Sequence, residues 1–283
     1  MKTILLVIII MTSILNAEET EGTKSCCSTA PEKFSNFSKD KQFAPSHNVP
    51  IAFNFHSEVG KMIDINLEEK KPAKAFMISG NSDKYVFVIH EWWGLNNHIK
   101  KEAENIFRDL GGEINVIALD LYDGKVATTR EDARNYMQEA TKDMNRLLSI
   151  FNSAIQMVKT KSDKATIATI GWCFGGGMSM QLAIEAAENA SACVIYYGMP
   201  EENMQRLKNL EADVLGIFAT QDKWINPGVV KEFENRMNAT NKNLELHSYE
   251  ANHAFANPSN PGHKPKMAKD AHKKAIKFIL EKL

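Results

Sequence analysis

The most constraining feature of this sequence is the stretch Thr166–Gly177, which reads TIATIGWCFGGG. An apolar run rich in β-branched residues leads to one reactive residue, Cys173, and a segment rich in Met, Leu and Ala follows. This order predicts a strand, a sharp turn and a helix, with Cys173 in the nucleophile position of a G-x-nucleophile-x-G motif. Gly171 and Gly175 fit, because a strained turn leaves little room for Cβ atoms beside the nucleophile. Unpaired backbone N–H groups at the start of a helix would favour the Cys173 thiolate.

Phosphate binding is the main alternative for a glycine-rich turn before a helix. No Gly-Lys-Ser/Thr follows the turn, and the third glycine is misplaced for a dinucleotide fingerprint, so the sequence argues against nucleotide binding. The formal charge of −1 and the scattered lysines give no electrostatic signature of a nucleic-acid partner. With 283 residues, 43% of them hydrophobic, the chain can bury a sizeable core.

The amino-terminal region predicts an exported protein. Residues 1–17 combine a positive start, an apolar run from Ile4 to Met11 and a small residue at Ala17, which indicates a cleaved signal peptide. We therefore expect a periplasmic or secreted protein without stable membrane insertion after cleavage, although an uncleaved anchor is the alternative. Residues 18–60 are polar, contain three prolines and show no sustained periodicity, so they predict an extension that wraps or links.

Four cysteines in an exported chain raise the question of disulfides. A Cys173–Cys193 bridge is one possibility, but Cys193 lies in a strand-like run and is expected to pack as a small buried residue. The adjacent Cys26 and Cys27 could form a strained local disulfide, bind a metal with some histidine, or be inert.

From residue 61 onward, strand and helix patterns alternate. Apolar runs suited to strands lie at 62–66, 73–78, 84–89, 114–119, 165–170, 192–197, 213–218 and 244–249. Helical periodicity appears at 98–110, at 140–159, around Val229–Met237 and in the last segment, Ala268–Ile279. The alternation predicts an α/β fold with a mostly parallel twisted sheet of about eight strands and helices on both faces. The first two runs are expected to form an antiparallel edge.

A base and an orienting acid should follow a nucleophile placed in this way. Asp222 comes directly after the strand run 213–218, and His253 follows the run 244–249. Alone, Asp222 could be a turn residue and His253 a surface or structural histidine. Together with Cys173 they have the order nucleophile, acid, histidine, each at a strand end.

The sequence resembles the dienelactone hydrolase family of α/β-hydrolases over residues 61–283. The resemblance rests on HEWWGLN at 90–96, ALDLYDG at 118–124, GWCFGG at 171–176, the Asp222 turn and HAF at 253–255. It implies the α/β-hydrolase fold and a catalytic triad of Cys173, Asp222 and His253.

The resemblance also implies a resting-state carboxylate beside the thiol, which falls on Glu91. A buried Glu91 could share a hydrogen bond with the thiol until substrate displaces it; the alternative is an exposed salt bridge in a loop. The oxyanion hole would consist of the backbone N–H groups of Trp92 and Phe174.

The substrate pocket is less well defined by the sequence. Asn257 stands where dienelactone-cleaving members of the family place an arginine that holds the substrate carboxylate, and it cannot supply that charge. An aromatic pocket is expected instead. Its candidate lining residues are Trp93, Tyr122, Trp172, Trp224 and Phe255.

These features predict an exported hydrolase that cleaves a small-molecule ester, lactone or thioester through a covalent acyl-enzyme on Cys173. No metal and no organic cofactor are implied, and a monomer or small homo-oligomer is expected. Two alternatives stay open. One is a non-hydrolytic ligand-binding protein of the same fold, and the other is a thiol redox or metal-handling protein built on Cys26 and Cys27.

Overall fold

The computed structural model describes residues 29–68 and 70–283. The predicted signal peptide at 1–17, the residues Cys26 and Cys27, and the first part of the predicted extension lie outside these ranges. No helix among the described residues is long and apolar enough to cross a membrane.

The described chain forms an eight-stranded sheet in the order β1-β2-β4-β3-β5-β6-β7-β8. The strands are β1 (Gly60–Leu67), β2 (Lys70–Ile78), β3 (Lys84–Ile89), β4 (Asn115–Leu119), β5 (Thr166–Trp172), β6 (Ala190–Tyr196), β7 (Asp213–Ala219) and β8 (Leu244–Tyr249). β1 pairs with β2 and β2 with β4 in antiparallel register, whereas β4, β3, β5, β6, β7 and β8 run parallel. The predicted α/β class and antiparallel edge are confirmed.

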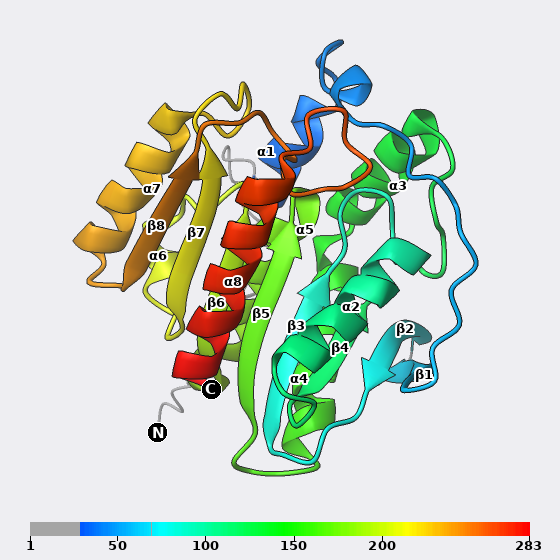
Figure 1. Ribbon diagram of the computed structural model, residues 1–283. Coiled ribbons are helices and arrows are strands. Elements are labelled where there is room, and N and C mark those ends of the chain that lie inside the picture. The colour runs from blue at the N-terminus through cyan, green and yellow to red at the C-terminus, as the bar shows by residue number, and fades with distance from the viewer. Residues whose placement is uncertain (1–28, 69) are drawn as a thin grey trace, which may run out of the picture.

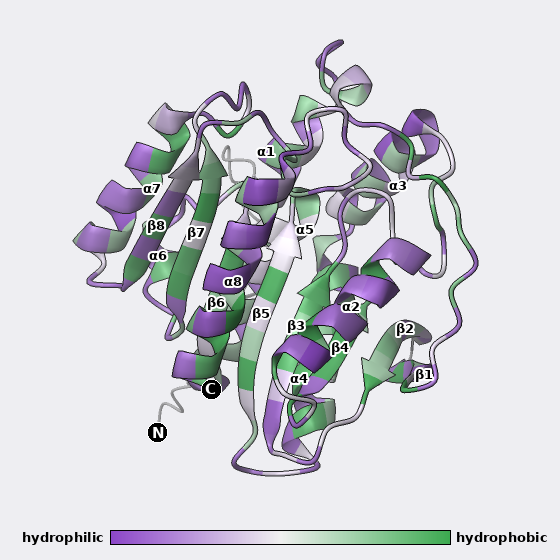
Figure 2. Ribbon diagram, in the orientation of Figure 1, coloured by the Kyte–Doolittle hydropathy of each residue, from purple (hydrophilic) through white to green (hydrophobic). Residues whose placement is uncertain are grey.

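Helices cover both faces of this sheet (Figure 1). The described helices are α1 (Ala30–Phe37), η1 (Ala44–Ser46), α2 (Asn97–Asp109), α3 (Arg130–Lys142), α4 (Met144–Lys159), α5 (Phe174–Ala186), η2 (Ala187–Asn189), α6 (Met204–Leu207), α7 (Pro227–Ala239) and α8 (Pro265–Lys282). α2 and α8 lie in front of the sheet in Figure 1, and α4 and α5 lie behind it. Figure 2 shows the same arrangement by hydropathy, with apolar central strands and polar outer helix surfaces.

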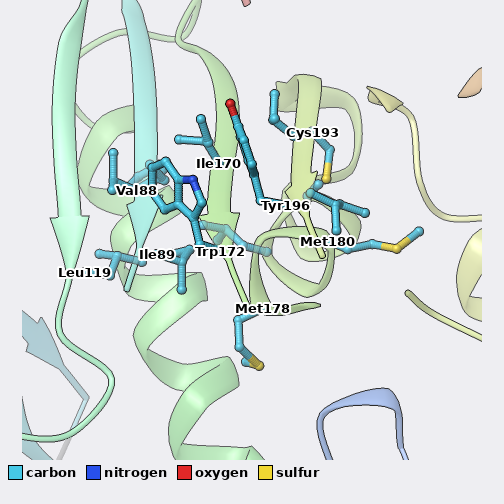
Figure 3. Close-up of a cluster of buried hydrophobic side chains, with 14 of the residues drawn as sticks. Val88, Ile89, Leu119, Ile170, Trp172, Met178, Met180, Cys193 and Tyr196 are labelled. Carbon is cyan, nitrogen blue, oxygen red and sulfur yellow. The ribbon is translucent and has the colours of Figure 1, made fainter. Parts of the chain in front are cut away.

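The core is densest around the central strand β5. Figure 3 shows Ile170 and Trp172 of β5 among side chains from β3, β4, β6 and α5. Ile170, Val88 and Met178 have no solvent exposure. Strands that are buried on both faces read as continuous apolar runs, which is why the sequence pattern located the central strands well.

The helical pattern at 140–159 is divided into two helices. Asp143 separates α3 from α4, and its side chain accepts a hydrogen bond from the backbone N–H of Arg146 at 3.0 Å. An aspartate at a helix N-cap stabilises the new helix more than it stabilises continuation of the old one. The region 140–159 therefore contains the end of α3, a break at Asp143 and the whole of α4.

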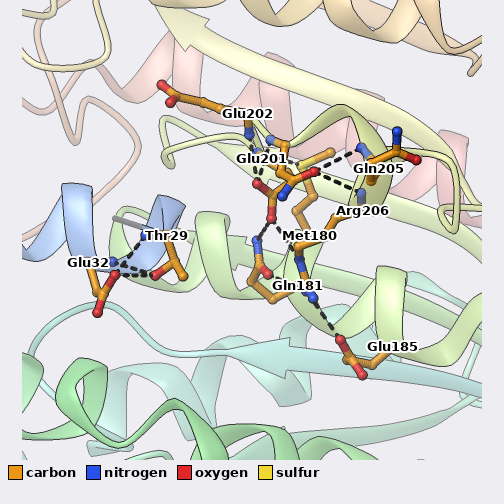
Figure 4. Close-up of polar contacts among 10 residues, drawn as sticks. Thr29, Glu32, Met180, Gln181, Glu185, Glu201, Glu202, Gln205 and Arg206 are labelled. Atoms are coloured by element: carbon orange, nitrogen blue, oxygen red, sulfur yellow. Dashed lines mark hydrogen bonds and ion pairs between the residues drawn. The ribbon is translucent and has the colours of Figure 1, made fainter. Parts of the chain in front are cut away.

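Residues 29–59, which we call the N-terminal strap, contain more regular structure than the sequence predicted. α1 begins with a capping box in which Thr29 and Glu32 exchange hydrogen bonds, drawn in Figure 4. The helix contacts α3 and α5. In Figure 1 it lies above the carboxyl ends of the central strands, and the strap then runs down the right-hand side to β1.

Candidate active site

The predicted nucleophile lies in a strained turn between β5 and α5. Cys173 has φ 58° and ψ −121°, a conformation that costs energy for any residue with a side chain. A Cβ atom on Gly175 would lie 2.4 Å from the backbone oxygen of His90, and one on Gly171 would lie 2.0 Å from the oxygen of Gly175. Both predicted glycines are thus required by backbone contacts.

Helix α5, which begins directly after Cys173, is fixed by a polar network at its side. Glu201 is buried and accepts hydrogen bonds from Gln181 at 3.1 Å and from Arg206 at 3.0 Å (Figure 4). Arg206 also bonds Glu185 at 3.2 Å. These bonds tie the helix to the segment that follows β6, and they hold the turn that presents the cysteine.

Three predicted side chains, distant in the sequence, meet at the carboxyl ends of their strands. Nδ1 of His253 lies 2.6 Å from Oδ2 of Asp222, and Nε2 of the same ring lies 3.4 Å from Sγ of Cys173. Asp222 also accepts hydrogen bonds from the backbone N–H groups of Trp224 and Ile225, at 2.8 and 3.0 Å. These distances are compatible with acyl transfer by a nucleophile, a base and an orienting acid.

The electrostatic surroundings of Asp222 and Cys173 differ. Burial would raise the pKa of Asp222, but the charge and hydrogen bond of His253 and the two backbone N–H groups hold it below its ordinary value. Burial raises the pKa of Cys173 well above its ordinary value, and the charge of Glu91 raises it further. The N–H group at the helix start favours the thiolate as expected, but in this closed arrangement desolvation outweighs its effect on the pKa of Cys173.

The backbone N–H groups of Phe174 and Trp92 point at the sulfur and lower its pKa, against the effect of burial. They are the two donors predicted for the oxyanion hole. Two amides directed at one sulfur are positioned to bind an oxygen that becomes negative next to it.

Glu91 is buried near the sulfur, but its carboxylate is held by Asn257. Nδ2 of Asn257 donates to Oε2 of Glu91 at 2.5 Å. Burial raises the pKa of Glu91 to about 7, against the lowering effects of His253 and of this hydrogen bond. The predicted hydrogen bond between Glu91 and the thiol is not found among the described residues, although the Glu91 charge acts on the sulfur.

The surrounding loop is shaped by His90 and Asp120, which the sequence motifs contain. Nδ1 of His90 donates to the backbone oxygen of Glu91 at 2.6 Å, and Nε2 accepts from the N–H of Leu121 at 3.1 Å. Asp120 accepts hydrogen bonds from the backbone N–H groups of Tyr122 and Gly124. Both residues have positioning roles.

With this geometry in place, comparison with known proteins decides the family. A sequence profile described as "Dienelactone hydrolase family" matches residues 73–283. The chain belongs to the dienelactone hydrolase family. Membership makes it a hydrolase that acts on carboxylic esters or lactones.

Sequence relatives agree with the family assignment. A putative carboxymethylenebutenolidase of Aquifex aeolicus is 27% identical over 201 residues, which cover 69% of this chain and 86% of that protein. A carboxymethylenebutenolidase of Pseudomonas sp. is 28% identical over 114 residues, or 40% of this chain and 47% of that protein.

The solved structures show the fold. A dienelactone hydrolase-like promiscuous phosphotriesterase from metagenomic libraries has a TM-score of 0.67 at 18% identity, covering 79% of this chain and 99% of that one. A Pyrococcus furiosus esterase has a TM-score of 0.58 at 15% identity, covering 81% and 96% of the two chains.

The N-terminal strap, which precedes the region matched to the dienelactone hydrolase family, adds a residue that sequence reasoning missed. Nε2 of His47 lies 3.9 Å from Sγ of Cys173, and the His47 side chain is buried. Burial lowers the pKa of His47 to about 3, so its ring is neutral. The capping box and the phenylalanines of the strap could have indicated an ordered segment, but no sequence pattern pointed to this histidine.

The strap closes the site from above. Phe43 is fully buried, and its ring centroid lies 4.5 Å from that of His47, 5.2 Å from Trp92 and 5.0 Å from Trp224. Several hydrogen bonds hold the strap, and three of them involve Asp40, Ser46 and His47. These three join Arg130 to the oxygen of His47 at 2.7 Å, Asn260 to the oxygen of Ser46 at 2.9 Å, and Trp224 to Asp40 at 3.2 Å. As a result Cys173 has no solvent exposure.

A cavity of about 470 Å³ borders the site, and Pro50 and Phe53 of the strap contribute to its lining. Of the predicted pocket residues, Trp93 and Trp172 line it, as do Glu91 and Asn257. Tyr122, Trp224 and Phe255 are not among the residues that line this cavity. Tyr122 stacks on Phe174, Trp224 packs under the strap and Phe255 packs between Tyr197 and Tyr249.

Proposed function

We propose that this hydrolase cleaves its ester, lactone or thioester through a covalent acyl-enzyme on Cys173, with His253 as the base and Asp222 as the orienting acid. The observation that carries the proposal is the continuous chain of contacts from Asp222 Oδ2 to His253 Nδ1 at 2.6 Å and from His253 Nε2 to Cys173 Sγ at 3.4 Å.

The chemistry follows from the states of these groups. The buried thiol keeps its proton at rest, because the pKa of Cys173 is raised by burial. As the sulfur attacks the acyl carbon, its proton passes to Nε2 of His253, and Asp222 stabilises the imidazolium that forms. The N–H groups of Trp92 and Phe174 would stabilise the negative acyl oxygen. His253 then protonates the leaving alcohol or thiol, and a water activated by the same ring releases the acid.

Substrate access through the cavity gives Glu91 a defined place in this scheme. Glu91 lines the cavity and its charge acts on the sulfur, so a ligand that advances from the cavity toward Cys173 meets this carboxylate. We propose that the ligand displaces Glu91 from the sulfur's surroundings. An acyl group without a carboxylate of its own suits this route, since Glu91 would repel a second negative charge.

Replacing the nucleophile tests the proposal. Cys173→Ala is expected to lower kcat/KM for a small aryl ester and for a neutral lactone by about 1,000-fold or more, because the covalent route is lost. Cys193→Ala is the matched control, since Cys193 is also a buried free cysteine but contacts Ser179 and not the triad. Turnover in Cys173→Ala equal to that of the control would refute the mechanism.

The complete burial of the sulfur is the observation that favours a second function, a binding protein of the same fold. In that case the unmodified protein binds an ester in the cavity without turning it over. A mass increase equal to the acyl group, located on Cys173 after brief mixing with an activated ester, separates the hydrolase from the binding protein.

A further inference from the structure

Three donor atoms converge on one point in the closed site. Sγ of Cys173, Nε2 of His47 and Nε2 of His253 all lie within 4.8 Å of one another. All three residues are buried, and they come from the N-terminal strap, the turn before α5 and the loop after β8. The proposed mechanism uses Cys173 and His253 and gives no role to His47.

The hydrogen bonds of the two rings show which nitrogens carry protons. Nδ1 of His47 lies 2.7 Å from the backbone oxygen of Phe43, which can only accept, so this nitrogen donates. Nδ1 of His253 likewise faces the carboxylate of Asp222 at 2.6 Å. In neutral rings both Nε2 atoms therefore present a lone pair, and both are directed at the same sulfur.

One thiol proton cannot satisfy two lone pairs. Sγ lies 3.4 Å from Nε2 of His253, a normal distance for a thiol donor, and 3.9 Å from Nε2 of His47. Among the hydrogen bonds of the described residues, the sulfur is the sole partner of the His47 Nε2 atom. A buried acceptor without a good donor costs free energy, and a cation shared by the three atoms would remove that cost.

The donor set and spacing suit zinc. Thiolate and imidazole are the ligands that zinc prefers among protein side chains. Zn–S and Zn–N bonds of about 2.3 and 2.0 Å in a tetrahedral arrangement place sulfur and nitrogen about 3.5 Å apart, between the two distances found here. The carbonyl of Phe43 and the carboxylate of Asp222 already bond the second nitrogen of each ring, which is how zinc-binding histidines are usually oriented.

We propose that His47, Cys173 and His253 form a zinc site that locks the N-terminal strap over the nucleophile. On binding, Zn²⁺ replaces the thiol hydrogen, the sulfur becomes a bound thiolate and one proton leaves to solvent. The charge of the ion is then balanced by this thiolate and the nearby Asp222 carboxylate. The ion would be bound by Nε2 of His253 and by Sγ of Cys173 at the same time, so neither the base nor the nucleophile could react.

An inhibited, closed enzyme is the consequence, and this part rests on the proposed function. Zinc would connect a strap residue to two residues that the reaction requires, so removal of the ion is expected to restore both turnover and strap opening. The three protein ligands come from three different segments of the chain. Opening of the strap would remove His47 from the site, and turnover would require Cys173 and His253 to be free of the ion.

The experiment measures zinc binding directly on the full chain. Cys26 and Cys27 are replaced by serine in every protein tested, so that they do not contribute to the count of bound ions. Metal-free protein is titrated with Zn²⁺ against a chromophoric chelator, and with Co²⁺ as a spectroscopic substitute. We expect one ion per chain, a thiolate-to-cobalt charge-transfer band and an increase in Tm.

The variants identify the ligands. His47→Ala is expected to weaken zinc binding by about 100-fold or more, and Cys173→Ser to remove the charge-transfer band. His56→Ala is the matched control, because His56 is an exposed histidine of the same strap. It should leave zinc affinity and metal-free turnover unchanged. Absence of stoichiometric binding, or equal affinity in His47→Ala and the control, would overturn the zinc site.

Turnover measured in the same samples separates this inference from the proposed function. Metal-free protein that hydrolyses esters but binds no zinc leaves the mechanism intact and rejects the site. Protein that binds zinc through His47 and shows no turnover in the metal-free form supports the site and rejects the hydrolase mechanism. Hydrolysis that zinc suppresses in the parent but not in His47→Ala supports both.

Discussion

Glu91 illustrates how one buried carboxyl group can set the reactivity of a neighbouring thiol. Its pKa is raised to about 7 by burial, and its charge raises the pKa of Cys173. A raised pKa means that Glu91 contributes stability fully below its ordinary pKa of 4.5 and that this contribution is lost as the pH rises through about 7. The protein therefore ionises Glu91 at neutral pH at a cost in stability, and the thiol becomes harder to ionise as it does so.

Replacing Glu91 with Gln removes that charge while keeping a similar shape. We expect iodoacetamide to label Cys173 about tenfold faster near pH 8 in Glu91→Gln than in the parent, since one pKa unit changes the thiolate fraction tenfold. Labelling is followed by mass spectrometry on metal-free protein. Glu188→Gln, which changes an exposed carboxylate in η2, is the control. An identical pH profile in both variants would remove the role proposed for Glu91.

At the scale of elements, the N-terminal strap is anchored over the active site by the aromatic side chain of Phe43. Phe43 packs against His47, Trp92 and Trp224 and has no solvent exposure. Truncation of a fully buried phenylalanine typically costs about 3–5 kcal/mol, because its contacts are lost and a cavity remains. We expect the lost free energy to come from the docking of the strap, because Phe43 belongs to the strap.

Phe43→Ala is therefore expected to open the strap more often. If docking is weakened by about 3 kcal/mol, the open population rises about 100-fold, and labelling of Cys173 in metal-free protein should accelerate accordingly. Ile51→Ala is the control, since Ile51 is 83% exposed on the same strap. Unchanged labelling in Phe43→Ala would mean that the strap does not limit access to the sulfur.

The elements and the convergence of Cys173, Asp222 and His253 could be predicted from the sequence for the same physical reason. The run 84–89 coincides with β3, because a buried parallel strand is apolar almost throughout and ends at a polar loop. The run 244–249 coincides with β8, the half-exposed last strand of the sheet, in which Leu244 and Leu246 alternate with polar residues. Cys173, Asp222 and His253 follow such ends, so their strand order alone brings them to one edge.

His47 and the division at Asp143 could not be predicted in this way. His47 acquires its position from Phe43 and from aromatic residues contributed by later parts of the chain, and no local periodicity records those contacts. Asp143 interrupts a helical pattern whose apolar positions continue on both sides, so its cap was hidden by the periodicity. Tertiary packing and a single capping bond decided these features.

At the scale of the whole molecule, a histidine joins the two helices α2 and α8 that cover the front of the sheet. Nε2 of His272 on α8 lies 2.7 Å from Oδ2 of Asp109 at the end of α2, and its Nδ1 lies 3.5 Å from Glu102. The hydrogen bond with Glu102 raises the pKa of His272, and Asp109 adds to the effect. The contribution to stability is therefore fully present below the ordinary pKa of about 6.5 and is lost as the pH rises through the higher value in the folded protein.

His272→Gln is expected to lower the free energy of unfolding at pH 6 by about 1 kcal/mol or less, since solvent screens this half-exposed pair. The difference from the parent should shrink as the pH rises toward 9. Urea unfolding at several pH values measures it, with His56→Gln as the control. A difference that grows with pH would contradict the assigned sign.

The position of the strap at the start of the chain has a consequence for how the protein is made. Ser46 is bonded by Asn260, a residue 214 positions later, and the rings around Phe43 include Trp224 and His253. During synthesis the strap must wait for segments near the other end of the chain before it can dock. Each newly made molecule thus passes through a period in which Cys173 is accessible to solvent. Small electrophiles or metal ions near the folding chain can reach its sulfur until the strap docks.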